Sequence, residues 1–121
     1  MSRKKRNVPL PVIEDTPDEF IAWLEAHPHE TFRRSDSDSC PLACYLNRRF
    51  RCRAKVTSGE YSVMYGGQRL REHTPAWASR FVRELDRQQP DILEEDPFAD
   101  VWSVTATEAL QTAQWAKDVG A

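Results

Sequence analysis

The spacing of hydrophobic residues predicts a helix over residues 17–26, near the start of the chain. Large apolar side chains recur there on one helical face, with charged side chains on the other faces. Thr16 and Glu19 have the spacing of a capping box, and Pro17 suits the first helical position. His27 precedes a proline and ends the helix, because the residue before proline resists helical geometry. We expect this helix to anchor the hydrophobic core.

A second helix is predicted over residues 41–49, with Asp38 or Ser39 as its cap. Its apolar stripe comprises Leu42, Ala43, Leu46 and Phe50. Cys40 and Cys44 project to one side of this stripe, where buried structural thiols are less usual. The position of these two cysteines therefore leaves their role open at this point.

The hydrophobic period changes to two after residue 50, which predicts strands. Residues 51–55 alternate basic with small apolar side chains, as in a half-buried strand. Residues 60–65 form a second alternating segment, and Gly66-Gly67 is a strong signal for a two-residue hairpin turn. Residues 68–71 would return as a third strand. The pattern thus predicts a three-stranded antiparallel meander with one face packed by helices.

Two further helices complete the predicted fold. Residues 75–88 carry a clear apolar face, and a last helix begins after Thr105, with Glu108 completing a capping box. The predicted class is a single α+β domain in the order α-α-β-β-β-α-α, with about four helices around the meander. We assign residues 1–15 to a basic, proline-containing N-terminal arm and residues 16–121 to the domain.

Composition bounds the class of protein. The 121 residues suit one domain with a modest core, and 40% hydrophobic with 30% charged residues is typical of a folded chain. No apolar run is long enough to span a bilayer, and the short proline-broken stretch after the basic start is no signal peptide. Three cysteines without an export signal indicate free thiols. We expect a cytoplasmic protein with no membrane partner.

The net charge is only −2, but the charges are segregated along the chain. Residues 1–7 carry four positive charges, and residues 8–32 carry six acids without a lysine or arginine. Residues 33–55 hold seven basic side chains against two acids, and residues 91–121 hold seven acids against one lysine. This layout predicts either pairing between the blocks or two faces of opposite potential. It argues against a uniformly basic nucleic-acid binder.

Two groups of side chains are candidate binding surfaces. The basic candidate belongs to the predicted meander and comprises Arg51, Arg53, Lys55, Arg69 and Arg71. The acidic and aromatic candidate comprises Glu94, Glu95, Asp96, Asp100, Trp102 and Trp115. The alternative for the basic group is a solvated face whose edge charges prevent aggregation. Along residues 75–88, Arg80, Arg83 and Arg87 align as either ordinary surface or a phosphate-contacting ridge.

Three interpretations remain open for Cys40, Cys44 and Cys52. The thiols pack as small apolar groups, bind a metal with one of the three histidines, or supply a reactive thiolate at Cys40. Their CxxxC spacing is looser than a zinc CxxC pair, so packing is favoured and no metal or other cofactor is expected. No motif of catalysis is present, and we expect no enzyme.

A resemblance adds to this interpretation. Three motifs carry it in order along the chain, with a short hairpin before the last: Glu30-Thr-Phe32, Cys40-Pro-Leu-Ala-Cys-Tyr-Leu46 and Pro75-Ala-Trp-Ala-Ser-Arg-Phe-Val82. This order resembles small proteins encoded by phages, prophages and other mobile elements. In size, acidity and lack of active-site chemistry the chain is also similar in type to anti-CRISPR and other anti-defence proteins. The resemblance implies structural motifs and no catalytic residues.

The first hypothesis is therefore a non-enzymatic binding protein of mobile-element type that blocks a host protein or protein complex through its acidic surface. An alternative is a nucleic-acid-binding accessory module that uses the basic candidate with Lys4 and Lys5. A further alternative is a thiol- or zinc-dependent regulator built on the three cysteines. The sequence does not define an oligomeric state.

Overall fold

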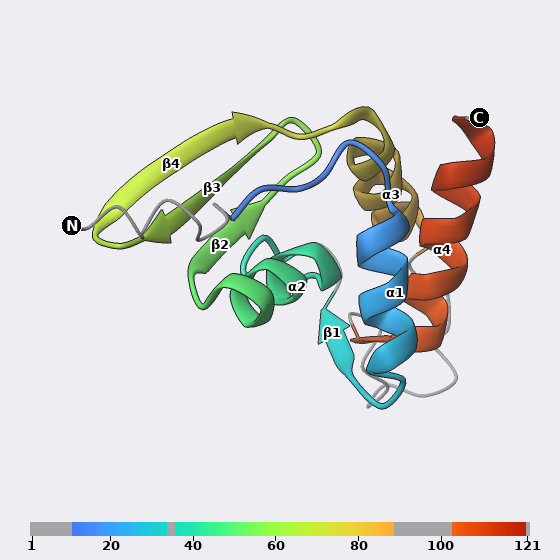
Figure 1. Ribbon diagram of the computed structural model, residues 1–121. Coiled ribbons are helices and arrows are strands. Elements are labelled where there is room, and N and C mark those ends of the chain that lie inside the picture. The colour runs from blue at the N-terminus through green and yellow to red at the C-terminus, as the bar shows by residue number, and fades with distance from the viewer. Residues whose placement is uncertain (1–10, 34–35, 89–102, 121) are drawn as a thin grey trace, which may run out of the picture.

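The computed structural model describes residues 11–33, 36–88 and 103–120, which contain four helices and five strands (Figure 1). In chain order the elements are α1 (Asp18–Ala26), β1 (Thr31–Arg33), α2 (Pro41–Phe50), β2 (Arg53–Val56), β3 (Glu60–Tyr65), β4 (Gln68–His73), α3 (Ala76–Arg87), β5 (Ser103–Thr105) and α4 (Ala106–Val119). The predicted single α+β domain, its four helices and its antiparallel meander are confirmed. A small sheet of β1 and β5 is an addition that the sequence did not predict.

The meander consists of β2, β3 and β4 in that order, each strand antiparallel to the next. Gly66 and Gly67 connect β3 to β4 with φ angles of 61° and 82°, which glycine adopts without the steric cost that a Cβ imposes. One face of the sheet is buried and comprises Ala54, Val56, Tyr61 and Val63. The alternation seen in the sequence therefore sorts these strands into an inner and an outer face, as predicted.

Helices α1, α3 and α4 lie side by side, and α2 lies between this group and the meander (Figure 1). Phe20 on α1 is fully buried, and its ring centroid lies 5.3 Å from that of Tyr45 and 5.2 Å from that of Phe81. Helix α4 contributes fully buried small side chains: Ala109, Ala113 and Ala116. These contacts confirm that the first helix anchors the core, and they bring α4 close to α1 and α3.

The two-stranded sheet joins parts of the chain that are far apart in sequence. Phe32 on β1 pairs with Val104 on β5, and both side chains are buried. The backbone N–H of Ala106 donates to the carbonyl oxygen of Glu30 and extends the contact into α4. Strands of three residues are too short to show alternation, so the sequence pattern could not reveal them.

Residues 11–15 pack against the folded domain, although they were predicted to belong to an N-terminal arm. Pro11 and Ile13 are buried. The backbone N–H of Ile13 donates to the Tyr61 hydroxyl at 3.0 Å, and the indole N–H of Trp77 donates to the carbonyl oxygen of Glu14 at 2.8 Å. Residues 11–15 therefore pack against the domain and are not part of an arm.

The start of α1 differs from the prediction. The helix begins after Pro17 without a side-chain cap, so the expected capping box of Thr16 and Glu19 is not formed. The Glu19 carboxylate instead accepts a hydrogen bond from the Arg49 guanidinium at 3.0 Å. This charge-assisted contact between α1 and α2 replaces a local one.

The predicted cap of α2 is wrong, and the predicted cap of α4 is confirmed. Cys40 occupies the cap position of α2, not Asp38 or Ser39 as expected. The capping box of α4 is confirmed, because the Thr105 hydroxyl accepts from the Glu108 backbone N–H at 3.1 Å and the Glu108 carboxylate accepts from the Thr105 N–H at 2.9 Å. Both helices nevertheless begin where the sequence predicts, α2 at Pro41 and α4 after Thr105.

Candidate functional site

The outer face of the meander carries a cluster of basic side chains. Cross-strand register forms two rows on this face: Arg53–Met64–Arg69 and Lys55–Ser62–Arg71. The four cations are exposed, and we call them the basic face. Because strands lie about 5 Å apart and two residues span about 7 Å, their Cα atoms mark a rectangle of about 10 by 7 Å. A third row of Glu60 and His73 marks the end of this cationic area.

Arg51 does not belong to the basic face, contrary to the sequence prediction. Helix α2 extends to Phe50, and Arg51 forms its C-terminal cap in the left-handed conformation with φ of 54°. Strand β2 therefore begins two residues later than expected, at Arg53. The other four predicted residues of the basic candidate lie together as the alternation required.

The basic face has no acidic partner among the described residues. No ion pair or side-chain hydrogen bond links any of its four cations to residues 11–33, 36–88 or 103–120. Acids near the N-terminus pair elsewhere. Their ion pairs are Glu30 with Arg48, Glu14 and Glu19 with Arg49, and Asp18 with Lys117. The acidic block of residues 8–32 is therefore neutralised in part, while no described acid neutralises the basic face.

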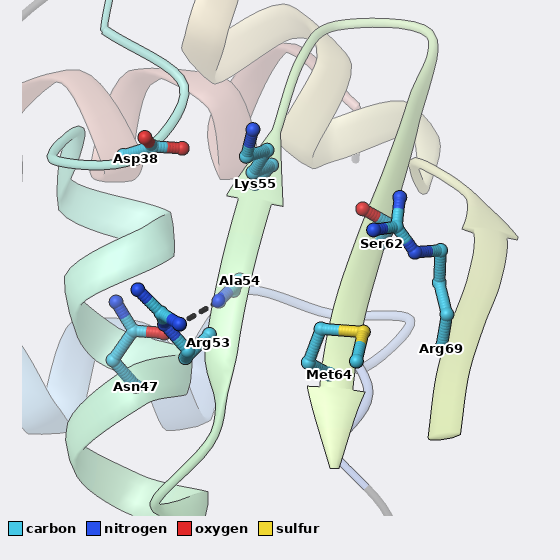
Figure 2. A pocket seen from close by; sticks show the side chains of 8 residues that line it. All are labelled: Asp38, Asn47, Arg53, Ala54, Lys55, Ser62, Met64 and Arg69. Carbon is cyan, nitrogen blue, oxygen red and sulfur yellow. Dashed lines mark hydrogen bonds between the residues drawn. The ribbon is translucent and has the colours of Figure 1, made fainter. Parts of the chain in front are cut away.

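A groove of about 390 Å³ lies between α2 and the basic face (Figure 2). Three cations of the basic face line it, together with side chains from the α2 side and from β3: Asp38, Asn47, Ser62 and Met64. Its size falls within the range of small-molecule pockets, about 300–1,000 Å³. The groove and the basic face thus form one continuous candidate site.

One wall of the groove is fixed by hydrogen bonds to the outer edge of β2. The Ala54 N–H donates to the side-chain oxygen of Asn47 at 2.7 Å, and the Val56 N–H donates to the Ser37 carbonyl oxygen at 3.0 Å. Because Asn47 uses its oxygen in this way, its amide nitrogen remains a donor. Within the described part of the chain, no strand pairs with the opposite edge of the meander, along β4.

Asp38 lies at the α2 side of the groove, across from Lys55 (Figure 2). Its backbone N–H donates to the Asp36 carboxylate at 3.0 Å, which holds the loop before α2. The Asp38 side chain is exposed, and no described residue forms an ion pair or hydrogen bond with its carboxylate. Met64, in the same lining, is 38% exposed and adds an apolar element.

The cysteines pack against the core, as the favoured interpretation predicted. Cys40 is buried, and this burial raises the pKa of its thiol to about 12, which does not suit the reactive thiolate considered above. The Cys44 thiol donates to the Ser39 carbonyl oxygen, and the Cys52 thiol donates to that of Leu46. Among the described residues, no group of three or more His, Cys, Asp or Glu is placed to hold a metal ion.

The arginines of α3 do not form a ridge that is free to contact phosphates. The Arg80 guanidinium donates to the Ala116 carbonyl oxygen near the end of α4 at 2.9 Å. Arg87 forms an ion pair with Glu84 on its own helix. Arg83 is exposed on α3 and lines a second pocket with Asp36 and Val56, not the groove. The ordinary-surface interpretation therefore fits Arg87, whereas Arg80 is half-buried and bonds within the fold.

The acidic and aromatic candidate is described only at Trp115. That side chain is 41% exposed on α4, near Val119, which is 52% exposed. The other members lie outside the described residues: Glu94, Glu95, Asp96, Asp100 and Trp102. The hypothesis of an acidic surface that blocks a host complex stays a prediction, as does the mobile-element type.

Sequence reasoning missed four side chains of the groove. Ser62 and Met64 follow from the same alternation that placed the basic residues, because they are the outward positions of β3. Asp38 has the sequence position of a helix cap and Asn47 carries no local signal, because the sequence pattern does not reveal that α2 packs along β2. The groove therefore depends on tertiary packing.

In comparisons with known proteins, no family model, no curated protein and no solved structure matches the chain. Among the described helices, none has both the length and the apolar character needed to cross a membrane.

Proposed function

We propose that the protein is a non-catalytic nucleic-acid-binding module whose contact surface is the basic face. The observation that carries this proposal is the unpaired state of its four cations among the described residues. Free lysine and arginine side chains bind phosphates and release counterions. Cations that are already paired with carboxylates would first have to give up those partners.

The chemistry of the face suits phosphate groups. Three of its four cations are arginines, whose planar fork donates two hydrogen bonds to one phosphate. Its other outward side chains are small, polar or aliphatic, and the tyrosines of β3 belong to the opposite face. The face itself therefore favours contact with the backbone over stacking of bases on the sheet.

The net charge of −2 is compatible with this function. Association depends on the electrostatic potential at the contact surface itself. Carboxylates that are paired with cations elsewhere on the protein reduce the positive potential of the basic face only weakly. Several acids of the N-terminal half are paired with Arg48, Arg49 and Lys117. The basic face thus supports local attraction of a polyanion on a weakly acidic protein.

Fluorescence anisotropy with labelled single-stranded and duplex oligonucleotides, over a range of salt concentrations, tests the proposal. Four phosphate contacts give a slope of log K against log salt of about −3 for a single strand. Arg53→Gln and Arg69→Gln are each expected to weaken binding and to reduce that slope by about 0.7. Arg83→Gln removes the same charge from α3, outside the groove lining, and should leave the slope unchanged.

Two results contradict the proposal. One is the absence of binding to both single strands and duplexes at low salt. The other is an equal loss of affinity in the Arg83→Gln control, which would assign the binding to net charge rather than to the basic face.

A further inference from the structure

We infer that the groove beside the basic face accepts one unpaired nucleobase, with guanine preferred, so that the nucleic acid bound is single-stranded. This inference rests on the proposed function and names its ligand class. The juxtaposition that carries it is the carboxylate of Asp38 and the amide of Asn47 in a groove that three cations also line.

The negative charge of the Asp38 carboxylate disfavours a phosphate in the groove. A ligand that donates hydrogen bonds to this carboxylate would be favoured there. Phosphates carry only acceptor oxygens and negative charge, so a carboxylate beside their path repels them. Bases, in contrast, present N–H groups, and Asp or Glu side chains accept hydrogen bonds from them. Lys55 lies across the groove without forming an ion pair with Asp38, so the carboxylate remains available to such a donor.

Guanine matches the donors and acceptors of the groove best. Its Watson–Crick edge has two adjacent donors, the ring N1–H and the exocyclic amine, which fit the two oxygens of the Asp38 carboxylate. Beside them lies the O6 acceptor, for which the Asn47 amide nitrogen is a donor. The orientation of Asn47 is fixed, because its oxygen holds the Ala54 N–H at 2.7 Å. Adenine, cytosine and thymine lack this pair of adjacent donors.

A single strand follows from the same geometry. In a duplex the Watson–Crick edge is paired, so only an unpaired and unstacked base offers it to a protein side chain. The Met64 thioether, which is in the groove lining and 38% exposed, provides an apolar surface against which a base can lie. The four cations of the basic face remain for the flanking phosphates.

The test uses labelled eight-nucleotide DNA strands of thymine with one central guanine, inosine, adenine or cytosine, at one fixed low salt concentration. The strand with guanine is expected to bind about tenfold more tightly than all-thymine, as a bidentate contact to a base edge does. Inosine lacks the exocyclic amine and should lose part of this preference. Asp38→Asn is expected to remove the guanine preference and to strengthen all-thymine binding, because it removes a negative charge from the groove.

Asp118→Asn is the matched control, since it makes the same charge change on exposed α4 and should keep the guanine preference. Three outcomes overturn the inference while the proposed function stands: equal binding of all strands, a guanine preference that survives in Asp38→Asn, or a duplex that binds as tightly as the single strand. Failure of every strand and duplex to bind overturns the proposed function itself. The two failures are therefore distinguishable.

Discussion

Alkaline pH is expected to destabilise the protein partly through Cys40, and Cys40→Ala is expected to reduce that sensitivity. Cys40, the N-cap residue of α2, is 6% exposed and belongs to the core. Burial raises its pKa from 9.0 to about 12 in the folded state. The unfolded chain exposes the thiol, so its pKa there stays near the ordinary value.

The sign of the effect follows from proton linkage. A pKa that is raised in the folded state leaves stability complete below pH 9, and stability falls as pH rises from 9 toward 12. In that range the unfolded chain has lost one proton that the folded chain retains. The free energy of unfolding therefore falls by about 1.4 kcal/mol per pH unit, or about 2 kcal/mol between pH 8 and pH 10.5, from this thiol.

Urea unfolding under reducing conditions at several values between pH 8 and pH 10.5 measures the effect. Cys40→Ala should lose less stability over this range than wild type, by about 2 kcal/mol. Val56→Ala is the matched control, because it truncates a buried side chain without a thiol and should shift the curve without changing its slope. Parallel curves for wild type and Cys40→Ala would refute the reasoning.

Two further predictions concern the frame of the groove and the hairpin. Asn47→Ala deprives the half-buried Ala54 N–H of its acceptor and should lower the free energy of unfolding by about 1–2 kcal/mol in a urea titration; an unchanged midpoint would contradict the role of Asn47. Gly67→Ala should cost about 1 kcal/mol, because its φ of 82° is strained for any residue with a Cβ although the space around it is open. Gly59→Ala, in equally open space and without a positive φ, should be close to neutral, and equal losses at both positions would disprove the backbone argument.

Periodicity predicted the parts of this fold that are locally determined. The alternation of β2 and β3, the glycine turn at 66–67 and the capping box at Thr105 each depend on residues close in sequence, and each is found. The same alternation placed four of the five residues of the basic candidate correctly. That success follows from the strict two-residue period of a strand, which fixes the face of every side chain once the strand is known.

The remaining features depend on contacts between distant residues. Strands β1 and β5 have three residues each, and they pair across about 70 residues of sequence, which no local pattern predicts. Arg80 looked like an exposed member of a basic stripe, yet its guanidinium reaches the Ala116 carbonyl oxygen across α4. The groove exists because α2 packs along β2, which no local pattern of Asp38 or Asn47 reveals. Sequence spacing therefore identified the charges of the site but not its shape.

The edge of β4, which no strand of the described residues pairs with, has a consequence for the free protein at high concentration. If two copies joined antiparallel along this strand about Leu70, Arg69 of each copy would face Arg71 of the other, and pairing about Arg71 would oppose two identical guanidiniums. Like charges directly opposite each other in adjoining strands repel, and such repulsion discourages sheet-to-sheet growth. The arginines that we propose as polyanion contacts would thus also oppose edge-to-edge association of the free molecules, and a bound anion would relieve that repulsion.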